Sequence, residues 1–148
     1  MIKLKDIISE IEHFKHFDQS KIRWGIEEDN YKFFVRMYIK GYQNPLRRLF
    51  VGLDMGISDS NPEWFGGIAL SKKNIKQQEG YLILSYVEVA EPKTGFGRAL
   101  FKKTLEELKK RGYKGLAVYK RDKRSRDAKH LLNKIVSFSD EHYDYINA

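Results

Sequence analysis

The sequence predicts a mixed α/β fold, with a central and mostly antiparallel sheet, one parallel βαβ unit and flanking helices. An apolar strand (81–89), an amphipathic helix (98–111) and a short apolar strand (115–119) follow one another with short links. That order is typical of a βαβ unit with parallel strands. The runs before it alternate as antiparallel strands do. Because 148 residues suit one domain, we expect residues 1–148 to form a single domain.

The N-terminal half is expected to hold a helix and then a hairpin. Apolar residues recur at three- and four-residue steps over 3–17, which favours a packing helix. The alternation over 22–26 indicates a strand, and 27–30 has the composition of a turn. The aromatic and branched residues of 31–39 indicate a second strand that pairs back. A helical period also fits this second run, so a helix there stays open.

The middle of the chain predicts further strands. An apolar run covers 47–57, and 57–62 has the composition of a loop. The short run 64–70 contains two glycines, which predicts a strand with a bulge or a close backbone approach. The run 81–89 is the most apolar strand, so we expect it at the centre of the sheet.

The C-terminal third begins with the clearest helix of the chain. It covers 98–111, and Gly112 stands where a C-terminal cap glycine belongs. A final helix is expected over 127–138. The alternating tail 142–146 is a candidate edge strand.

Composition and charge exclude several classes of site. There are no cysteines, hence no disulfides, thiolate metal sites or cysteine nucleophile. The four histidines show no recognisable ligand spacing, so no metal site is expected. No apolar run approaches the roughly 20 residues that span a bilayer, and the N-terminus lacks a signal-peptide pattern. We therefore expect a cytoplasmic protein without a membrane partner. The net charge of +8 favours an acidic protein, nucleic acid or phosphates as partners.

The turn between strand 81–89 and the following helix is the candidate binding site. Backbone N–H groups and the positive end of a helix dipole meet there and can hold a phosphate. Lys93 and Arg98 add positive charge, and Thr94 adds a donor. Gly95 and Gly97 form neither a Walker loop nor a complete dinucleotide fingerprint, because the spacing and the third glycine are missing. A pyrophosphate would fit this turn.

This region resembles the GNAT superfamily of N-acetyltransferases. Gly95-Phe96-Gly97 at a helix start is similar to the glycines of the family's acetyl-CoA motif, and Phe65-Gly-Gly-Ile-Ala-Leu70 resembles its preceding strand. The segment 128–138 is similar to the family's Ala-x-x-Leu-Tyr-x-Lys-x-Gly-Phe, and the resemblance covers roughly residue 50 to the end. The chain departs from the pattern at Pro92, the usual Arg or Gln position, and at Leu132, the usual general-acid tyrosine. The closing Gly-Phe of that motif is also displaced here.

The resemblance implies an acetyl-CoA-dependent N-acyltransferase that acts on a primary amine of an unknown acceptor. The turn would bind the CoA pyrophosphate, and the end of the preceding strand would pair with the pantetheine arm. The implied cofactor-binding residues are Val87, Val89, Lys93, Thr94, Gly95, Phe96, Gly97 and Arg98. Glu88 and Glu91 are the nearest acidic candidates for the general base, and Glu88 is preferred because it lies within the strand, although it also fits a solvated or ion-paired glutamate. Tyr143 is the candidate proton donor, with Tyr145 and Tyr119 as alternatives, although it also fits a packing tyrosine.

Two alternatives to this interpretation stay open. A basic nucleic-acid-binding module without catalysis could grip a backbone phosphate with the same turn. An acyltransferase could also act on a nucleic-acid-linked substrate. The dense basic run 120–126 suits contact with a CoA phosphate or nucleic acid, and equally a solvated loop.

Overall fold

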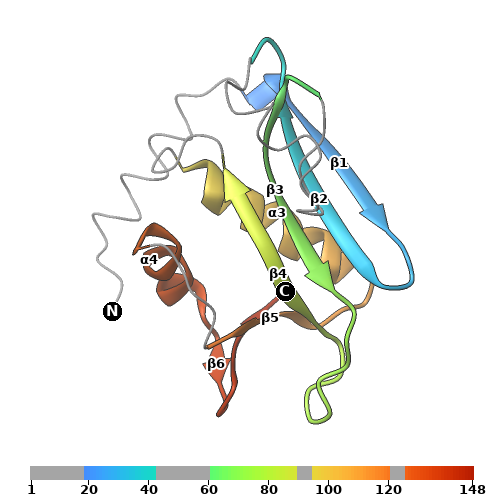
Figure 1. Cartoon of the computed structure of the whole chain (residues 1–148), viewed down its shortest axis with the longest axis vertical. Coiled ribbons are helices and arrows are strands. Elements are labelled where there is room, and N and C mark those ends of the chain that lie inside the picture. Colours follow the sequence, from blue (N-terminus) through green and yellow to red (C-terminus); the bar gives the residue numbers. More distant parts are fainter. Residues whose placement is uncertain (1–18, 43–60, 90–94, 121–125) are drawn as a thin grey trace.

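The fold is that of a computed structural model, which describes residues 19–42, 61–89, 95–120 and 126–148 (Figure 1). The expected helix over 3–17 and the apolar run 47–57 lie outside these residues. The elements are η1 (Gln19–Lys21), β1 (Ile22–Glu28), β2 (Lys32–Ile39), β3 (Trp64–Ser71), β4 (Tyr81–Val89), α3 (Phe96–Lys110), β5 (Gly115–Tyr119), α4 (Arg126–Ile135), β6 (Phe138–Ser139) and β7 (Tyr143–Asn147).

The strands form one seven-stranded sheet in the order β1-β2-β3-β4-β5-β7-β6. All neighbouring pairs are antiparallel except β4 and β5, which are parallel and joined by α3. The predicted mixed sheet with one parallel βαβ unit is therefore confirmed, and β4 is its fourth strand, as expected for a central position. No helix within the described ranges is long and apolar enough to cross a membrane.

The first two strands form the expected hairpin, and the helical alternative for 31–39 is wrong. Asp29 closes the turn, because its carboxylate accepts the N–H groups of Tyr31 and Lys32, each at 2.7 Å. Along β2, fully buried residues such as Phe33 and Val35 alternate with half-buried ones. That two-residue period puts one face of the strand on the core, whereas a helix would scatter the same side chains around its axis.

The main core lies between α3 and one face of the sheet. The buried side chains of this core include Phe33, Met37, Ile68, Leu84, Leu100, Leu108 and Leu116. A smaller cluster on the other face of the sheet is built on Trp64 and Ala69, with Phe34, Tyr38 and Tyr86 packed against it. The sheet therefore separates an apolar side, covered by α3, from a face that carries tyrosine and tryptophan side chains.

Helix α3 begins two residues earlier than the sequence predicted, at Phe96 rather than residue 98. Its N-cap, Gly95, has a φ of 84°, a left-handed conformation that lets the chain turn at once from the loop into the helix. The predicted cap at Gly112 is confirmed: Gly112 and Tyr113 donate their N–H groups to the carbonyls of Lys109 (3.1 Å) and Leu108 (3.0 Å). This pair of hydrogen bonds is the pattern of a Schellman cap.

Two C-terminal predictions are corrected. Helix α4 ends at Ile135 rather than at 138, because Phe138 joins strand β6 and pairs with Tyr145. The two rings stack at 4.6 Å. The tail does form a strand, β7, but it lies between β5 and β6 rather than at the edge. Its alternation does not distinguish an edge strand from an inner one, because the short β6 that covers it has no sequence signature of its own.

Gly66 confirms the close backbone approach expected of strand 64–70. A Cβ atom at Gly66 would lie 2.7 Å from the carbonyl oxygen of Glu88 and 3.3 Å from Cα of Val89. No side chain fits between β3 and the end of β4 at this point.

Gly66→Ala should therefore separate β3 from the end of β4. Because the obstacle is backbone rather than a movable side chain, we expect the free energy of unfolding to fall by about 1–3 kcal/mol. Urea denaturation followed by circular dichroism would measure the loss. Ser85→Ala, at an exposed position of the same strand pair, is the control and should change little. Equal stability of the Gly66 variant and the parent chain would contradict the close approach.

Glu107 on α3 should make the fold sensitive to acid. Its nearly buried carboxylate contacts Arg111 at 2.5 Å, Lys103 at 3.3 Å and Lys110 at 3.4 Å. The hydrogen bond from Arg111, more than the lysines, lowers the pKa of Glu107 from 4.5 to about 2. Because the pKa is lower in the folded state, the stabilisation is complete above pH 4.5 and is lost as the pH falls toward 2.

Glu107→Gln should lower the free energy of unfolding at pH 7 by about 1–2 kcal/mol, after allowance for solvent screening. The difference from the parent chain should shrink between pH 4.5 and pH 2. Urea denaturation at a series of pH values would measure it. The exposed neighbour is the control, and Glu106→Gln should show neither effect. A difference that stays constant down to low pH would show that the Glu107 ion pairs do not stabilise the fold.

Candidate functional site

The candidate site lies where β4 ends and α3 begins. Gly95 caps α3 without a side-chain hydrogen bond, and the first turn of the helix contains no acidic residue. The first amides of an α-helix have no partners within the helix, and together with the helix dipole they attract an anion. The helix start therefore has the geometry and the charge that an anionic ligand requires.

The turn residues predicted from the sequence have different environments. Gly95 and Phe96 are buried, whereas Gly97 and Arg98 are half-buried in the first turn of α3. The Phe96 ring packs on Phe65 of β3 at 4.6 Å, so only its backbone is suited to a ligand. Lys93 and Thr94 lie outside the described residues.

Strand β4 loses its parallel neighbour halfway along its length. It pairs with β5 at only three positions, Tyr81↔Gly115, Leu82↔Leu116 and Ile83↔Ala117. Its other edge stays paired with β3 as far as Val89. Figure 1 shows β4 and β5 diverging beyond the paired segment. Among the described residues, the stretch 84–89 of β4 thus has a β-ladder partner on one edge alone.

A bulge accompanies this separation. Leu84 pairs with Leu70 and Tyr86 pairs with Ala69, which leaves Ser85 as an extra, exposed residue. An extra residue bends its strand and increases the local twist. This bulge was not predicted, although the sequence of β4 contains a signal for it. The core-facing positions shift phase at Ser85, from Leu82 and Leu84 to Val87 and Val89.

Val87 and Val89 thus have a different role from the neighbouring glutamate. Their side chains pack against the main core, so a ligand could use only their backbone groups. Each residue is paired with β3, Val87 with Ile68 and Val89 with Gly66. The opposite edge of this stretch, on the side of β5, has no β-ladder partner among the described residues.

Glu88 points to the face of the sheet opposite α3, and a tyrosine holds it there. The hydroxyl of Tyr86 donates a hydrogen bond of 2.6 Å to Oε2 of Glu88. Burial, followed by this bond to Glu88, raises the pKa of Tyr86 above its usual value. Tyr86 therefore remains a neutral donor, and Glu88 keeps a second oxygen for another proton or ligand. Tyr86 was not among the predicted site residues, but residues i and i+2 of a regular strand lie on the same face.

Tyr143 begins β7 and lies opposite Tyr119, the last residue of β5. The two rings are 5.5 Å apart, and Tyr143 is half-buried beside the cluster of Tyr81, Ala117 and Tyr145. Because β4 and β5 run in parallel, Glu88 and Tyr143 lie at the same end of the sheet, on strands that have separated. Leu132, at the position of the family's usual tyrosine, is buried in the main core.

No protein-family model and no curated protein matches the chain. Among solved structures, the chain is similar to the crystal structure of "a putative acetyltransferase of the GNAT family" from Desulfovibrio desulfuricans, with 13% identity, a TM-score of 0.45, and coverage of 93% of this chain and 73% of that one.

Proposed function

We propose that this protein is an acetyl-CoA-dependent N-acyltransferase that transfers an acetyl group to a primary amine. The observation that carries the proposal is the separation of β4 from β5 after three residue pairs, directly before the glycine-capped start of α3. This arrangement offers an open strand edge and an anion-attracting helix start side by side. A ligand with amide groups joined to a pyrophosphate matches both.

The cofactor-binding residues would act mainly through their backbone. The amides that open α3, from Gly95 to Arg98, would bind the pyrophosphate, with the side chain of Arg98 adding charge. The open edge of β4 around Val87 and Val89 would pair with the amides of the pantetheine arm. Lys93 and Thr94 of the preceding turn would complete the phosphate contacts. Acetyl-CoA, when bound, supplies the activated acetyl group as a thioester.

Glu88 is proposed as the general base. An amine must lose a proton to attack a carbonyl, and a carboxylate can accept that proton directly or through one water. Tyr86 would hold Glu88 in place through its 2.6 Å hydrogen bond. Tyr143 would donate a proton to the departing sulfur. A new N–C bond replaces the C–S bond, and each proton has a named residue to accept or supply it.

CoA should raise the melting temperature of the protein. At 100 times its dissociation constant a ligand adds about 2.7 kcal/mol, which corresponds to roughly 5–10 °C for a domain of this size. Gly97→Trp should abolish the shift, because the indole would fill the space in front of the first turn of α3. Lys102→Trp, at an exposed position of the same helix, is the control and should keep it.

An unchanged shift in Gly97→Trp would refute the assignment of the pyrophosphate to this turn. No shift with CoA in the parent chain, together with salt-dependent binding of DNA or RNA, would instead favour the nucleic-acid-binding module. Responses to both ligands would favour an acyltransferase that acts on a nucleic-acid-linked substrate.

Glu88→Gln should lower kcat for acetyl transfer by roughly 10²-fold, because the amide cannot accept the proton. CoA should still raise the melting temperature, since the substitution leaves the backbone of β4 in place. Steady-state kinetics with a panel of primary amines would measure the first effect. Glu79→Gln, at an exposed position two residues before β4 begins, is the control. If the Glu88 variant matches the parent in kcat, Glu88 is not the base.

A further inference from the structure

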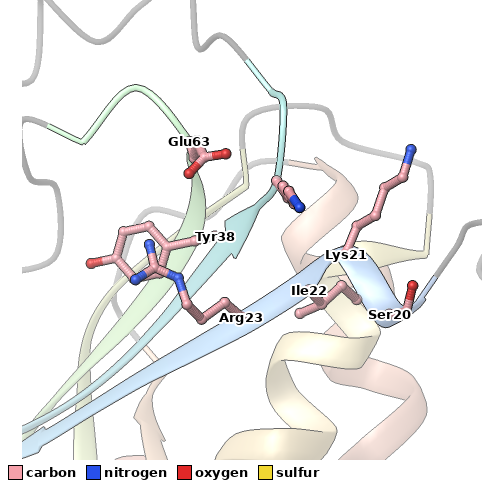
Figure 2. Close-up of a pocket in the computed structure, with 7 residues that line it drawn as sticks. Ser20, Lys21, Ile22, Arg23, Tyr38 and Glu63 are labelled. Atoms are coloured by element: carbon pink, nitrogen blue, oxygen red, sulfur yellow. The ribbon is translucent and has the colours of Figure 1, made fainter.

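A pocket of about 390 Å³ lies at the end of the sheet where β1 begins and β2 ends (Figure 2). It is lined by Ser20, Lys21, Ile22, Arg23, Tyr38, Lys40 and Glu63. In Figure 2, Arg23 lies across the ring of Tyr38 with Glu63 beyond it, and Lys21 and Ser20 stand on the other side of Ile22. The proposed catalytic groups do not include any of these residues.

The pocket shares its face of the sheet with Glu88. Arg23 pairs with Tyr38, and Tyr38 in turn with Trp64. Tyr38 packs against the Trp64 cluster on the face opposite α3, and Tyr86 packs against the same cluster. Tyr86 is the residue that donates its hydroxyl to Glu88. One continuous aromatic surface therefore connects the pocket to the proposed base.

The pocket has excess positive charge. Lys21, Arg23 and Lys40 face a single carboxylate, Glu63, whose Oε2 already accepts the N–H of Gly41 at 2.7 Å. Within the part of the chain that the structure describes, no carboxylate forms an ion pair with any of the three cations. The Arg23 guanidinium lies 4.8 Å from the centre of the Tyr38 ring, which orients its donors before any ligand arrives.

We propose that this pocket binds an anionic group, a phosphate or a carboxylate, of the amine acceptor. The inference rests on the proposed acyltransferase function. Arg23 on β1 lies three strand spacings across the sheet from Glu88 on β4 and two residues along it, or about 16 Å. The acceptor would therefore be extended, with roughly 10–15 Å between its anionic group and the amine that is acetylated. An acceptor whose acid lies next to its amine is too short to reach both.

The pocket can be tested without any acetyl transfer. Inorganic phosphate would be titrated into ¹⁵N-labelled protein that has first been saturated with CoA, so that the turn before α3 is blocked. We expect saturable shifts at the amides of Lys21, Arg23 and Lys40, and none in the Arg23→Gln/Lys40→Gln double variant. Lys32→Gln, at the exposed far end of β2, is the control and should keep the shifts.

Acceptor choice can be tested with capped peptides that contain one lysine and, four residues later, glutamate, phosphoserine or glutamine. Four extended residues span about 13 Å, which matches the proposed separation. We expect KM at least tenfold lower for an acidic peptide than for the glutamine peptide. Arg23→Gln should remove most of that preference by raising KM for the acidic peptides. The two acidic peptides distinguish a carboxylate from a phosphate.

The outcomes separate the two proposals. The absence of phosphate-induced shifts at the pocket would overturn the proposed anion site, whether or not the protein transfers acetyl groups. Phosphate binding without any effect of CoA on the melting temperature would leave an anion pocket in a protein that is not an acyltransferase. A CoA-binding protein that acetylates the glutamine peptide equally well, or acetylates neither acidic peptide, would overturn the assignment of the pocket to the acceptor.

Discussion

The arrangement of this protein depends on how the backbone of β4 satisfies its hydrogen bonds. One edge is paired with β3 from Ile83 to Val89, and the other is paired with β5 over only three residues. Backbone N–H and C=O groups need partners, so a strand that leaves its neighbour exposes groups that must pair with solvent or a ligand. The opening between β4 and β5 therefore sets both the shape and the chemistry of the candidate site.

Local features hold β4 in this position. The bulge at Ser85 bends the strand, and Gly66 allows the end of β4 to approach β3 more closely than any side chain would permit. Phe96 then fixes the start of α3 to β3 through its contact with Phe65. The left-handed Gly95 caps α3 at its start. These contacts are short-ranged, and together they fix how β4 meets β3 and where α3 begins.

The two faces of the sheet carry different properties. The face toward α3 is packed with aliphatic and aromatic side chains and provides the rigid support of the site. The opposite face carries Glu88 with its tyrosine partner and, farther along, a pocket with an excess of cations. Binding of a cofactor along the β4 edge and of an acceptor across the opposite face would bring the two to meet at Glu88. The net charge of +8 agrees with an anionic cofactor along the β4 edge and an anionic acceptor on the opposite face.

The sequence by itself determined the mixed sheet, the parallel βαβ unit and the C-terminal cap of α3. Those features follow from periodicity and from glycine, which act over a few residues. Only the tertiary structure decided that β4 leaves β5 after three pairs, that Tyr86 holds Glu88, and that Tyr38 joins the pocket to the same surface. It also decided that β7 lies inside the sheet rather than at its edge. These features depend on register and pairing between distant segments, which local patterns do not encode.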